Sequence, residues 1–148
     1  MAYNIEESSQ PRLWVAKMNV TLPEYSIDLY AKAIQTLKDE LQRMGVEQLE
    51  PEYSFTITEE PKANVNIVDI VLHVAVKNPG VDTDLIHFEA LEESEKLIRI
   101  EADDFVDIHT GLAEWMHEND YMADGELRRI VSTDRKYLFD CPVKPAED

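Results

Sequence analysis

Residues 27–45, IDLYAKAIQTLKDELQRMG, carry the strongest structural signal in the chain. Apolar side chains follow one another there in steps of three and four residues, the spacing of one helix face, at Ile27, Tyr30, Ile34, Leu37, Leu41 and Met44. Gly45 supplies the expected C-terminal stop. Two N-terminal caps compete, because Thr21 and Glu24 have capping-box spacing and Ser26 is also a capping residue. The stretch predicts a helix that begins within a few residues of Ser26.

Strand patterns lie on both sides of this helix. Residues 13–20 have a strand-like mixture of apolar and polar side chains. Residues 53–57 alternate aromatic or aliphatic side chains with hydroxyls, the period of a half-buried strand. Residues 65–76 place five aliphatic side chains on one face and Asp69 and His73 on the other. The first half of the chain therefore predicts strand, helix, strand, strand.

The same order begins again after the break at Asn78-Pro79-Gly80. The second half predicts a strand at residues 97–101, a helix with Asp103 as N-cap that ends near Asn119, and strands at residues 127–131 and 137–143. Its helical spacing is carried by Phe105, Ile108, Leu112 and Trp115.

The two halves predict one α+β domain over residues 1–148, made of two βαββ pseudo-repeats at about residues 12–77 and 86–144. Joined edge to edge, the repeats form one antiparallel sheet with both helices on one face. The other face is then open to form a ligand groove.

Charge narrows the classes of partner. The 148 residues include 14 Lys and Arg against 31 Asp and Glu, a formal charge of -17. Such a chain repels nucleic-acid phosphates and anionic membranes, and it attracts a basic protein.

Cys141 is the only cysteine, so no intramolecular disulfide forms. With a polar, acidic N-terminus and no apolar run of about 20 residues, we expect a cytoplasmic protein.

Residues 112–125, LAEWMHENDYMADG, the closing segment 137–143 and Asp69 together resemble the GyrI-like superfamily, the effector-binding domains of MerR- and AraC-type regulators. The resemblance spans nearly the whole chain and implies a small-molecule-binding domain. Leu138 stands where members that bind cationic aromatic drugs have a glutamate. Only about a dozen residues precede Leu13, too few for a DNA-reading helix-turn-helix module.

Five side chains are predicted to line the ligand groove, because aromatic walls with a few polar groups are typical of small-molecule sites. They are Trp14, Tyr53, Asp69, His73 and Tyr137. The apolar periodicity assigns Phe55, Phe105 and Trp115 to the core instead. The histidines and Cys141 lack metal-ligand spacing, and no phosphate loop or nucleophile motif is present, so we expect no metal, no cofactor and no catalytic site.

Two functions remain in view. The first is a stand-alone, non-DNA-binding domain that holds a small, partly aromatic effector. The second is an acidic protein-interaction module, such as an immunity or escort protein for a secreted toxin. The chain is also similar to short uncharacterised proteins of Gram-positive bacteria, some of which are encoded near secreted toxins, and the acidity suits a basic partner.

Overall fold

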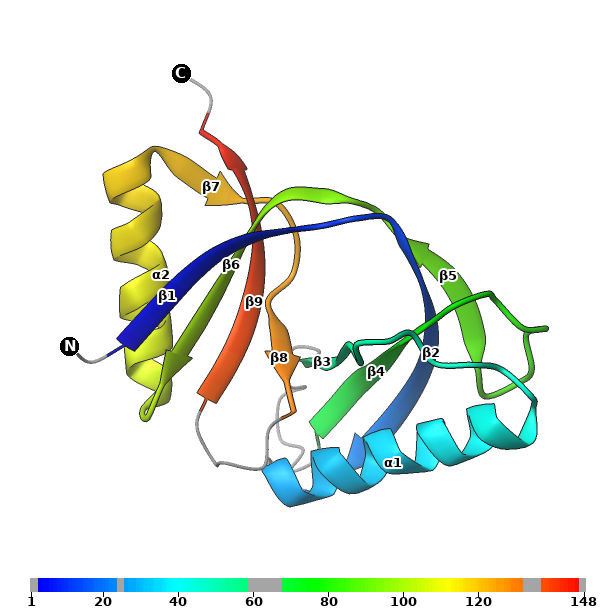
Figure 1. Ribbon diagram of the computed structural model, residues 1–148. Coiled ribbons are helices and arrows are strands. Elements are labelled where there is room, and N and C mark those ends of the chain that lie inside the picture. Colours follow the sequence, from blue (N-terminus) through cyan, green and yellow to red (C-terminus); the bar gives the residue numbers. More distant parts are fainter. Residues whose placement is uncertain (1–2, 24–25, 59–67, 132–136, 147–148) are drawn as a thin grey trace. The chain divides into compact units, whose positions relative to one another are not determined.

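The computed structural model describes residues 3–23, 26–58, 68–131 and 137–146. Two helices and nine strands lie in these ranges (Figure 1). In chain order they are β1 (Tyr3–Gln10), β2 (Leu13–Leu22), α1 (Ile27–Arg43), β3 (Ser54–Thr58), β4 (Val68–Val76), β5 (His87–Leu91), β6 (Ser94–Ala102), α2 (Phe105–Asn119), β7 (Tyr121–Ala123), β8 (Arg128–Ile130) and β9 (Tyr137–Pro145). The described strand pairs are antiparallel. The predicted α+β class is confirmed.

The chain divides into two compact units. The central unit is residues 12–92, and its strands lie in the order β5-β2-β4-β3. The terminal unit is residues 1–11 with 93–148, and its strands lie in the order β1-β6-β9-β8, with β7 beside the far end of β9. Each unit thus contains a strand, a helix and two further strands, plus one added edge strand beside the first, and the terminal unit also contains the short β7.

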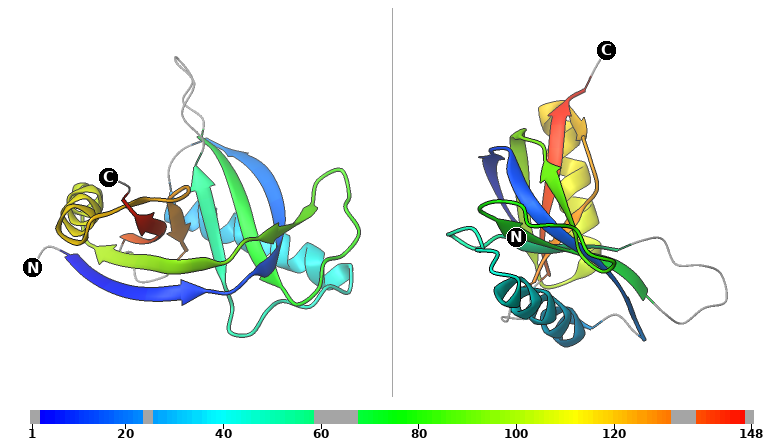
Figure 2. Two further views of the ribbon diagram at one scale, coloured as in Figure 1. Left: turned by 90° about the horizontal axis from the view of Figure 1, so that it is seen from above. Right: turned by 90° about the vertical axis from the view of Figure 1, so that its right-hand side faces the viewer.

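Helix α1 packs against β4 and β2 of the central unit, and both views in Figure 2 show it on one face of that sheet. The buried side chains of α1 belong to the apolar series that predicted this helix from the sequence. They face a row of aliphatic side chains on β4. The buried members are Tyr30, Ile34, Leu37 and Leu41 on the helix and Val68, Ile70, Leu72 and Val74 on the strand. Ser26 is the N-cap, since its Oγ accepts from Leu29 N at 3.4 Å. The competing cap residue Thr21 lies in β2 instead, and Glu24, its capping-box partner, lies outside the described residues.

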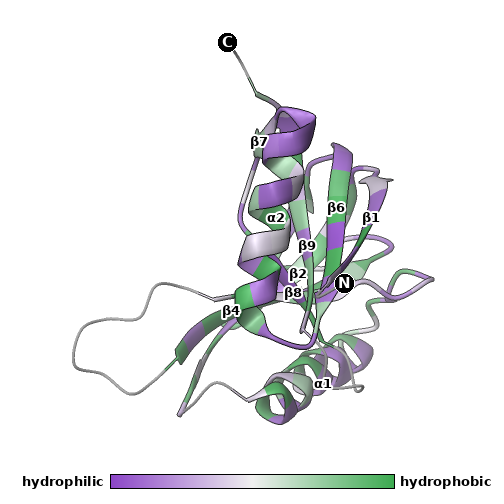
Figure 3. Cartoon of the chain, turned by 90° about the vertical axis from the view of Figure 1, so that its left-hand side faces the viewer, coloured by the Kyte–Doolittle hydropathy of each residue, from purple (hydrophilic) through white to green (hydrophobic). Residues whose placement is uncertain are grey.

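Helix α2 packs against one face of the terminal unit's sheet. Its buried cluster consists of Ile98, Ile100, Ala102, Ile108, Leu112, Phe139, Cys141 and Val143. Along β6 the hydrophobic and hydrophilic colours alternate in Figure 3, as expected for a strand with one face on the core. The helix ends at Asn119, near the predicted stop, and Asp120 turns the chain with φ 57°.

The predicted cap of α2 was wrong by one residue. Asp104 is the N-cap, and its carboxylate accepts from Val106 N at 2.9 Å. The chain therefore enters the helix one position later than a cap at Asp103 requires, which places Phe105 in its first turn.

Three strands, β1, β5 and the three-residue β7, had no clear signal in the sequence. In β1 only Tyr3 and Ile5 are apolar, because this edge strand packs one half of its length on the core and ends in polar residues. Strand β5 directly follows the loop that begins at Asn78. The strand predicted at 97–101 extends over Ser94–Ala102, and the one predicted at 127–131 is limited to Arg128–Ile130. Residues 65–67, also predicted as strand, lie outside the described ranges.

Neither described helix has both the length and the apolar composition needed to cross a membrane.

Candidate functional site

Three ring side chains lie in a row on the face of the central unit's sheet opposite α1. The centroids of Tyr53 and Phe55 are 5.2 Å apart, and Phe55 stacks on His73 at 4.3 Å with planes inclined by 17°. Phe55 of β3 is directly opposite His73 of β4, which explains the row because cross-strand neighbours share a face. Phe55 is 1% exposed and His73 5%. We call Tyr53, Phe55, Asp69 and His73 the aromatic face.

Asp69 and His73 lie on one face of β4, as their spacing predicts. The Asp69 carboxylate accepts a hydrogen bond from Thr21 Oγ1 at 2.7 Å, in an exposed position. His73 Nδ1 lies 3.1 Å from the carbonyl oxygen of Val71. A carbonyl oxygen only accepts hydrogen bonds, so Nδ1 carries the proton. This hydrogen bond to the Val71 carbonyl fixes the orientation of the His73 ring. The aromatic face thus combines stacked rings, of which Phe55 and His73 are buried, with the carboxylate of Asp69.

Trp14 does not belong to this face. It pairs with Val76 in the β2–β4 register, and the buried Val76 shares the strand face of Val74, which faces α1. Cross-strand neighbours share a face, so Trp14 and His73 lie on opposite faces of the sheet. The guanidinium of Arg12 lies 5.1 Å from the centroid of the Trp14 ring, a cation–π distance.

Tyr137 lies in the terminal unit, on the face that packs against α2. The Arg129 guanidinium carbon is 5.1 Å from its ring centroid, and the ring of Phe105 is 5.7 Å away. Phe105 itself is 42% exposed, although it also contacts Phe139 at 5.7 Å. Of the five predicted ligand-binding residues, the structure therefore places Tyr53, Asp69 and His73 on one face and Trp14 and Tyr137 elsewhere.

A second group of polar residues lies on the face of the terminal unit's sheet opposite α2. Asp140 is fully buried, and its carboxylate accepts two hydrogen bonds from Arg99, from Nε at 2.7 Å and from Nη2 at 2.9 Å. Arg128 is opposite Asp140 in the β8–β9 register, and its Nη1 donates to Gln10 Oε1. We call Gln10, Arg99, Arg128 and Asp140 the charged face.

Strand register explains how the charged face forms. Arg99 on β6 and Arg128 on β8 are both directly opposite Asp140 on β9, so two cations flank one carboxylate on the same face. A bidentate arginine pair is among the strongest polar contacts in proteins. Burial of such a pair has a large desolvation cost, so it specifies geometry more than it adds net stability.

Cys141 is adjacent in sequence but lies on the other face, in the cluster beneath α2. Burial raises the pKa of its thiol, and Asp140 also raises it, while Arg128 lowers it. The thiol therefore stays protonated and packs as a small apolar group. Among the described residues, His, Cys, Asp and Glu side chains form no group of three or more with the geometry to hold a metal ion.

No family model and no curated protein matches the chain. Solved structures provide the comparison. The fold of this chain is similar to that of the EcmrR C-terminal domain. That crystal structure aligns with a TM-score of 0.75 and 18% identity, over 99% of this chain and 100% of that one.

The same fold occurs within a longer protein. In the cryo-EM structure of the EcmrR–DNA complex, the TM-score is 0.76 at 18% identity, and 99% of this chain covers 59% of that chain. An uncharacterized conserved protein from Listeria innocua aligns with a TM-score of 0.55 and 14% identity, over 95% of this chain and 92% of that one. At these identities the shared property is the fold, which is consistent with the predicted GyrI-like architecture.

The charged face was missed from the sequence, although a signal was present. Arg99 stands between two isoleucines and Asp140 between Phe139 and Cys141. An ionisable residue between apolar neighbours in a strand lies on the face opposite the core. Two such residues of opposite sign in two predicted strands indicate a cross-strand ion pair, but the pairing of those strands had to be known first.

Proposed function

We propose that this chain is an effector-binding domain that holds a small, partly aromatic molecule on the aromatic face. The observation that supports the proposal best is the series Tyr53, Phe55 and His73, stacked on the face of the sheet that α1 does not use. A histidine and a carboxylate are not needed to pack a core, and sites that depart from simple core composition are often functional. The proposal includes no catalytic role.

The fold adds support of a more general kind. The chain aligns over the whole EcmrR C-terminal domain, and domains of the GyrI-like superfamily that it resembles bind effectors. Fold likeness alone does not identify a ligand. The chemistry of the aromatic face does limit it, because flat rings favour a flat, partly apolar ligand, and the Asp69 carboxylate favours a hydrogen-bond donor at its edge.

A thermal-shift screen of aromatic fragments tests the proposal. A fragment present at about 100 times its Kd stabilises the protein by about 2.7 kcal/mol, which raises Tm measurably. The shift should be lost in His73→Ala and kept in His109→Ala. His109 is a matched control because its ring also contacts a phenylalanine, Phe105, at 4.7 Å, but on α2. Equal losses in both variants, or no stabilising fragment in a broad library, would refute the proposal.

A second candidate rests on a separate observation. From Glu101 to Glu126 the chain has nine acidic residues and no Lys or Arg, and this stretch includes all of α2. A surface of one sign steers an oppositely charged protein. If the chain is instead an interaction module for a basic protein, association rates measured with such a partner should fall steeply between low and physiological salt. Salt-independent rates would contradict this candidate.

A further inference from the structure

Strand β1 is an edge strand of the terminal unit. Among the described strands it pairs with β6 alone, in a register that runs from Tyr3 opposite Ala102 to Gln10 opposite Ser94 (Figure 3). In an antiparallel pair, every second residue directs its backbone N–H and C=O groups toward the neighbouring strand, and the residues between them direct theirs outward. The outward groups follow one another along an edge of eight residues. Such an edge is a template for pairing with a further strand.

Most side chains of this edge are in contact with solvent. Asn4 and the four residues from Glu6 to Ser9 are exposed, whereas Tyr3 and Ile5 are half-buried against the cluster beneath α2. Because side chains alternate along a strand, Glu7 lies on the same face as Tyr3 and Ile5, toward α2. A strand added beside β1 would therefore have one face toward this helix.

Helix α2 lies close to the same edge. A Cβ at Gly111 would lie 2.9 Å from the Tyr3 ring, and Glu114 Oε2 accepts a hydrogen bond from the Tyr3 hydroxyl. This hydrogen bond raises the pKa of Tyr3, and the charge of Glu118, about one helical turn further along, raises it as well. Both carboxylates are therefore near β1, on its α2 side.

The two elements that flank the edge have one sign of charge. Strand β1 contains two carboxylates and α2 contains three, and neither element contains Lys or Arg. Glu7 pairs with Lys96 of β6 at 2.7 Å. Glu6 is opposite Arg99, whose guanidinium donates two hydrogen bonds to Asp140. The surface on the open side of β1 is thus acidic.

The edge strand of the central unit, β5, differs in this respect. Glu89 of β5 pairs with Lys17 at 2.7 Å, and His87 Nδ1 lies 3.4 Å from Asp82 Oδ2. The carboxylates at this edge are thus matched by basic side chains of the same unit. Of the two edges, β1 is the one whose charge discriminates between partners.

We infer that the edge of β1 binds an extended basic segment of another protein as an added strand, with Lys or Arg at alternate positions on the side of α2. Main-chain hydrogen bonds to the outward groups supply affinity, and Glu7, Glu114 and Glu118 select the basic side chains. A second copy of β1 is a poor occupant, because glutamates of the two strands would face one another. The inference rests on the second candidate function, the interaction module, and not on the aromatic face.

NMR tests the inference with a synthetic peptide, acetyl-(Lys-Thr)4-amide, added to the ¹⁵N-labelled chain. Alternation places its lysines on one face of a strand. We expect saturable shifts of the β1 amides and slower hydrogen exchange at every second residue of β1. The control is the same peptide with every backbone nitrogen methylated, which keeps the charge but donates no main-chain hydrogen bond. It should bind about tenfold more weakly or worse, since several hydrogen bonds of about 0.5–1.5 kcal/mol each are lost.

The outcomes separate this inference from the function on which it rests. Equal binding of the methylated peptide, or protection centred on β5, would overturn pairing at β1 but leave an interaction module that attracts basic chains by charge. No binding of either peptide would count against both.

Two variants test the role of α2. Glu114→Gln keeps an acceptor for Tyr3 but removes the charge, and it should weaken binding of the unmethylated peptide about two- to fivefold, the usual value of an exposed ion pair. Glu126→Gln makes the same change at an exposed position beside β8, which β6 and β9 separate from β1, and should have little effect. Equal losses in the two variants would contradict a basic segment that lies between β1 and α2.

Discussion

The terminal and central units share one strand order but differ in the chemistry of the face opposite the helix. In both, a helix packs on aliphatic side chains of its own sheet. On the opposite face the terminal unit has a buried aspartate paired with a partly exposed arginine, whereas the central unit has stacked aromatic rings and a histidine. The difference teaches that the face packed on the helix has the same aliphatic composition in both units, while the composition of the opposite face differs between them.

The largest expected effect on stability comes from removing the carboxylate of the charged face. Asp140→Ala leaves Arg99 and Arg128 beside an empty, desolvated position, and we expect the free energy of unfolding to fall by about 3–5 kcal/mol. Urea denaturation measures the loss. Asp124→Ala is the control, because Asp124 lies 3.9 Å from Lys144 in an exposed pair, and its loss should cost less than about 1 kcal/mol. If both variants lost the same free energy of unfolding, the charged face would contribute no more to stability than an exposed ion pair.

A second change tests how α2 approaches its sheet. A Cβ at Gly111 would lie 2.6 Å from Ile100 Cδ1 and 2.9 Å from the Tyr3 ring. Gly111→Val therefore overpacks this contact, and we expect a loss of about 1–3 kcal/mol in denaturation experiments. Thr110→Val adds the same side chain at the exposed neighbouring position and should be close to neutral. A stabilising effect of Gly111→Val would contradict the close packing of α2 against Ile100 and Tyr3.

The N-caps of the two helices provide a smaller comparison. Asp104→Ala should cost about 1 kcal/mol, because it removes a charged cap with a 2.9 Å hydrogen bond at the positive end of α2. Ser26→Ala should cost less, since its bond to Leu29 N is 3.4 Å long and its hydroxyl is neutral. Asp103→Ala, one residue before the α2 cap, should change Tm little. A reversed order for Asp103 and Asp104 would contradict the cap assignment.

The smallest expected effect is on the pH dependence of stability, through Glu52 of the central unit. The hydrogen bond from Lys38 lowers the pKa of Glu52, which links α1 to the segment before β3. A carboxyl with a lowered folded pKa stabilises fully above its unfolded pKa, about 4.3, and loses this contribution as pH falls through the lower folded value. We expect Glu52→Gln to cost about 0.2–1 kcal/mol at pH 7. Its cost should shrink as the pH falls through the lowered folded pKa, and a cost that grew on acidification would contradict this sign.

Much of the fold could be predicted from periodicity alone. Helix α1 and strand β4 were clear because each buries a regular series of aliphatic side chains, and such series follow from the geometry of the element. Strand β1 was not, because it pairs only with β6 in the described part of the chain and needs few apolar residues. The cap of α2 was missed because Asp103 and Asp104 are equivalent in sequence, and only backbone geometry selects between them.

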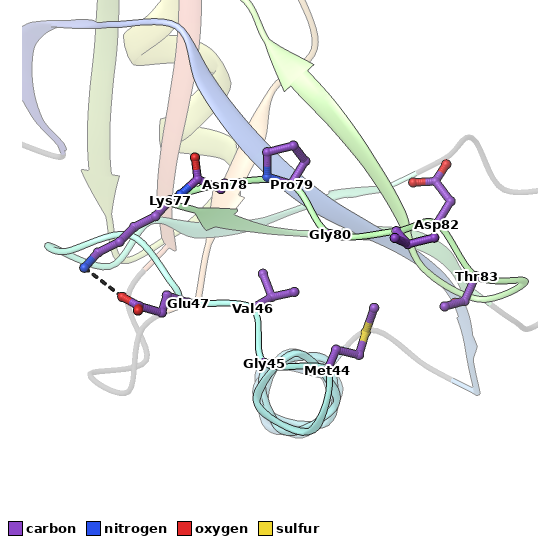
Figure 4. Close-up of a pocket in the computed structure, with 11 residues that line it drawn as sticks. Met44, Gly45, Val46, Glu47, Lys77, Asn78, Pro79, Gly80, Asp82 and Thr83 are labelled. Atoms are coloured by element: carbon purple, nitrogen blue, oxygen red, sulfur yellow. Dashed lines mark hydrogen bonds and ion pairs between the residues drawn. The ribbon is translucent and has the colours of Figure 1, made fainter.

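The candidate site was less predictable than the fold. Asp69 and His73 were placed together because a strand fixes the direction of residues four apart. Trp14 and Tyr137 were grouped with them by residue type, but their faces depend on strand register, which the sequence does not encode locally. A crevice in the central unit, between residues 44–47 and 77–83, also left no signal in the sequence, since it is formed by two segments that the fold alone brings together (Figure 4).

The most direct test uses the four histidines as reporters, because each lies in a different surrounding. His73 belongs to the aromatic face, His87 contacts Asp82, His109 contacts the ring of Phe105 on α2, and His117 lies in the last turn of α2. In protein labelled with ¹³C-histidine, a stabilising aromatic fragment should shift the His73 ring signals in a saturable manner and leave those of His109 and His117 in place. Saturable shifts at α2 with an unchanged His73 would contradict the assignment of ligand binding to the aromatic face.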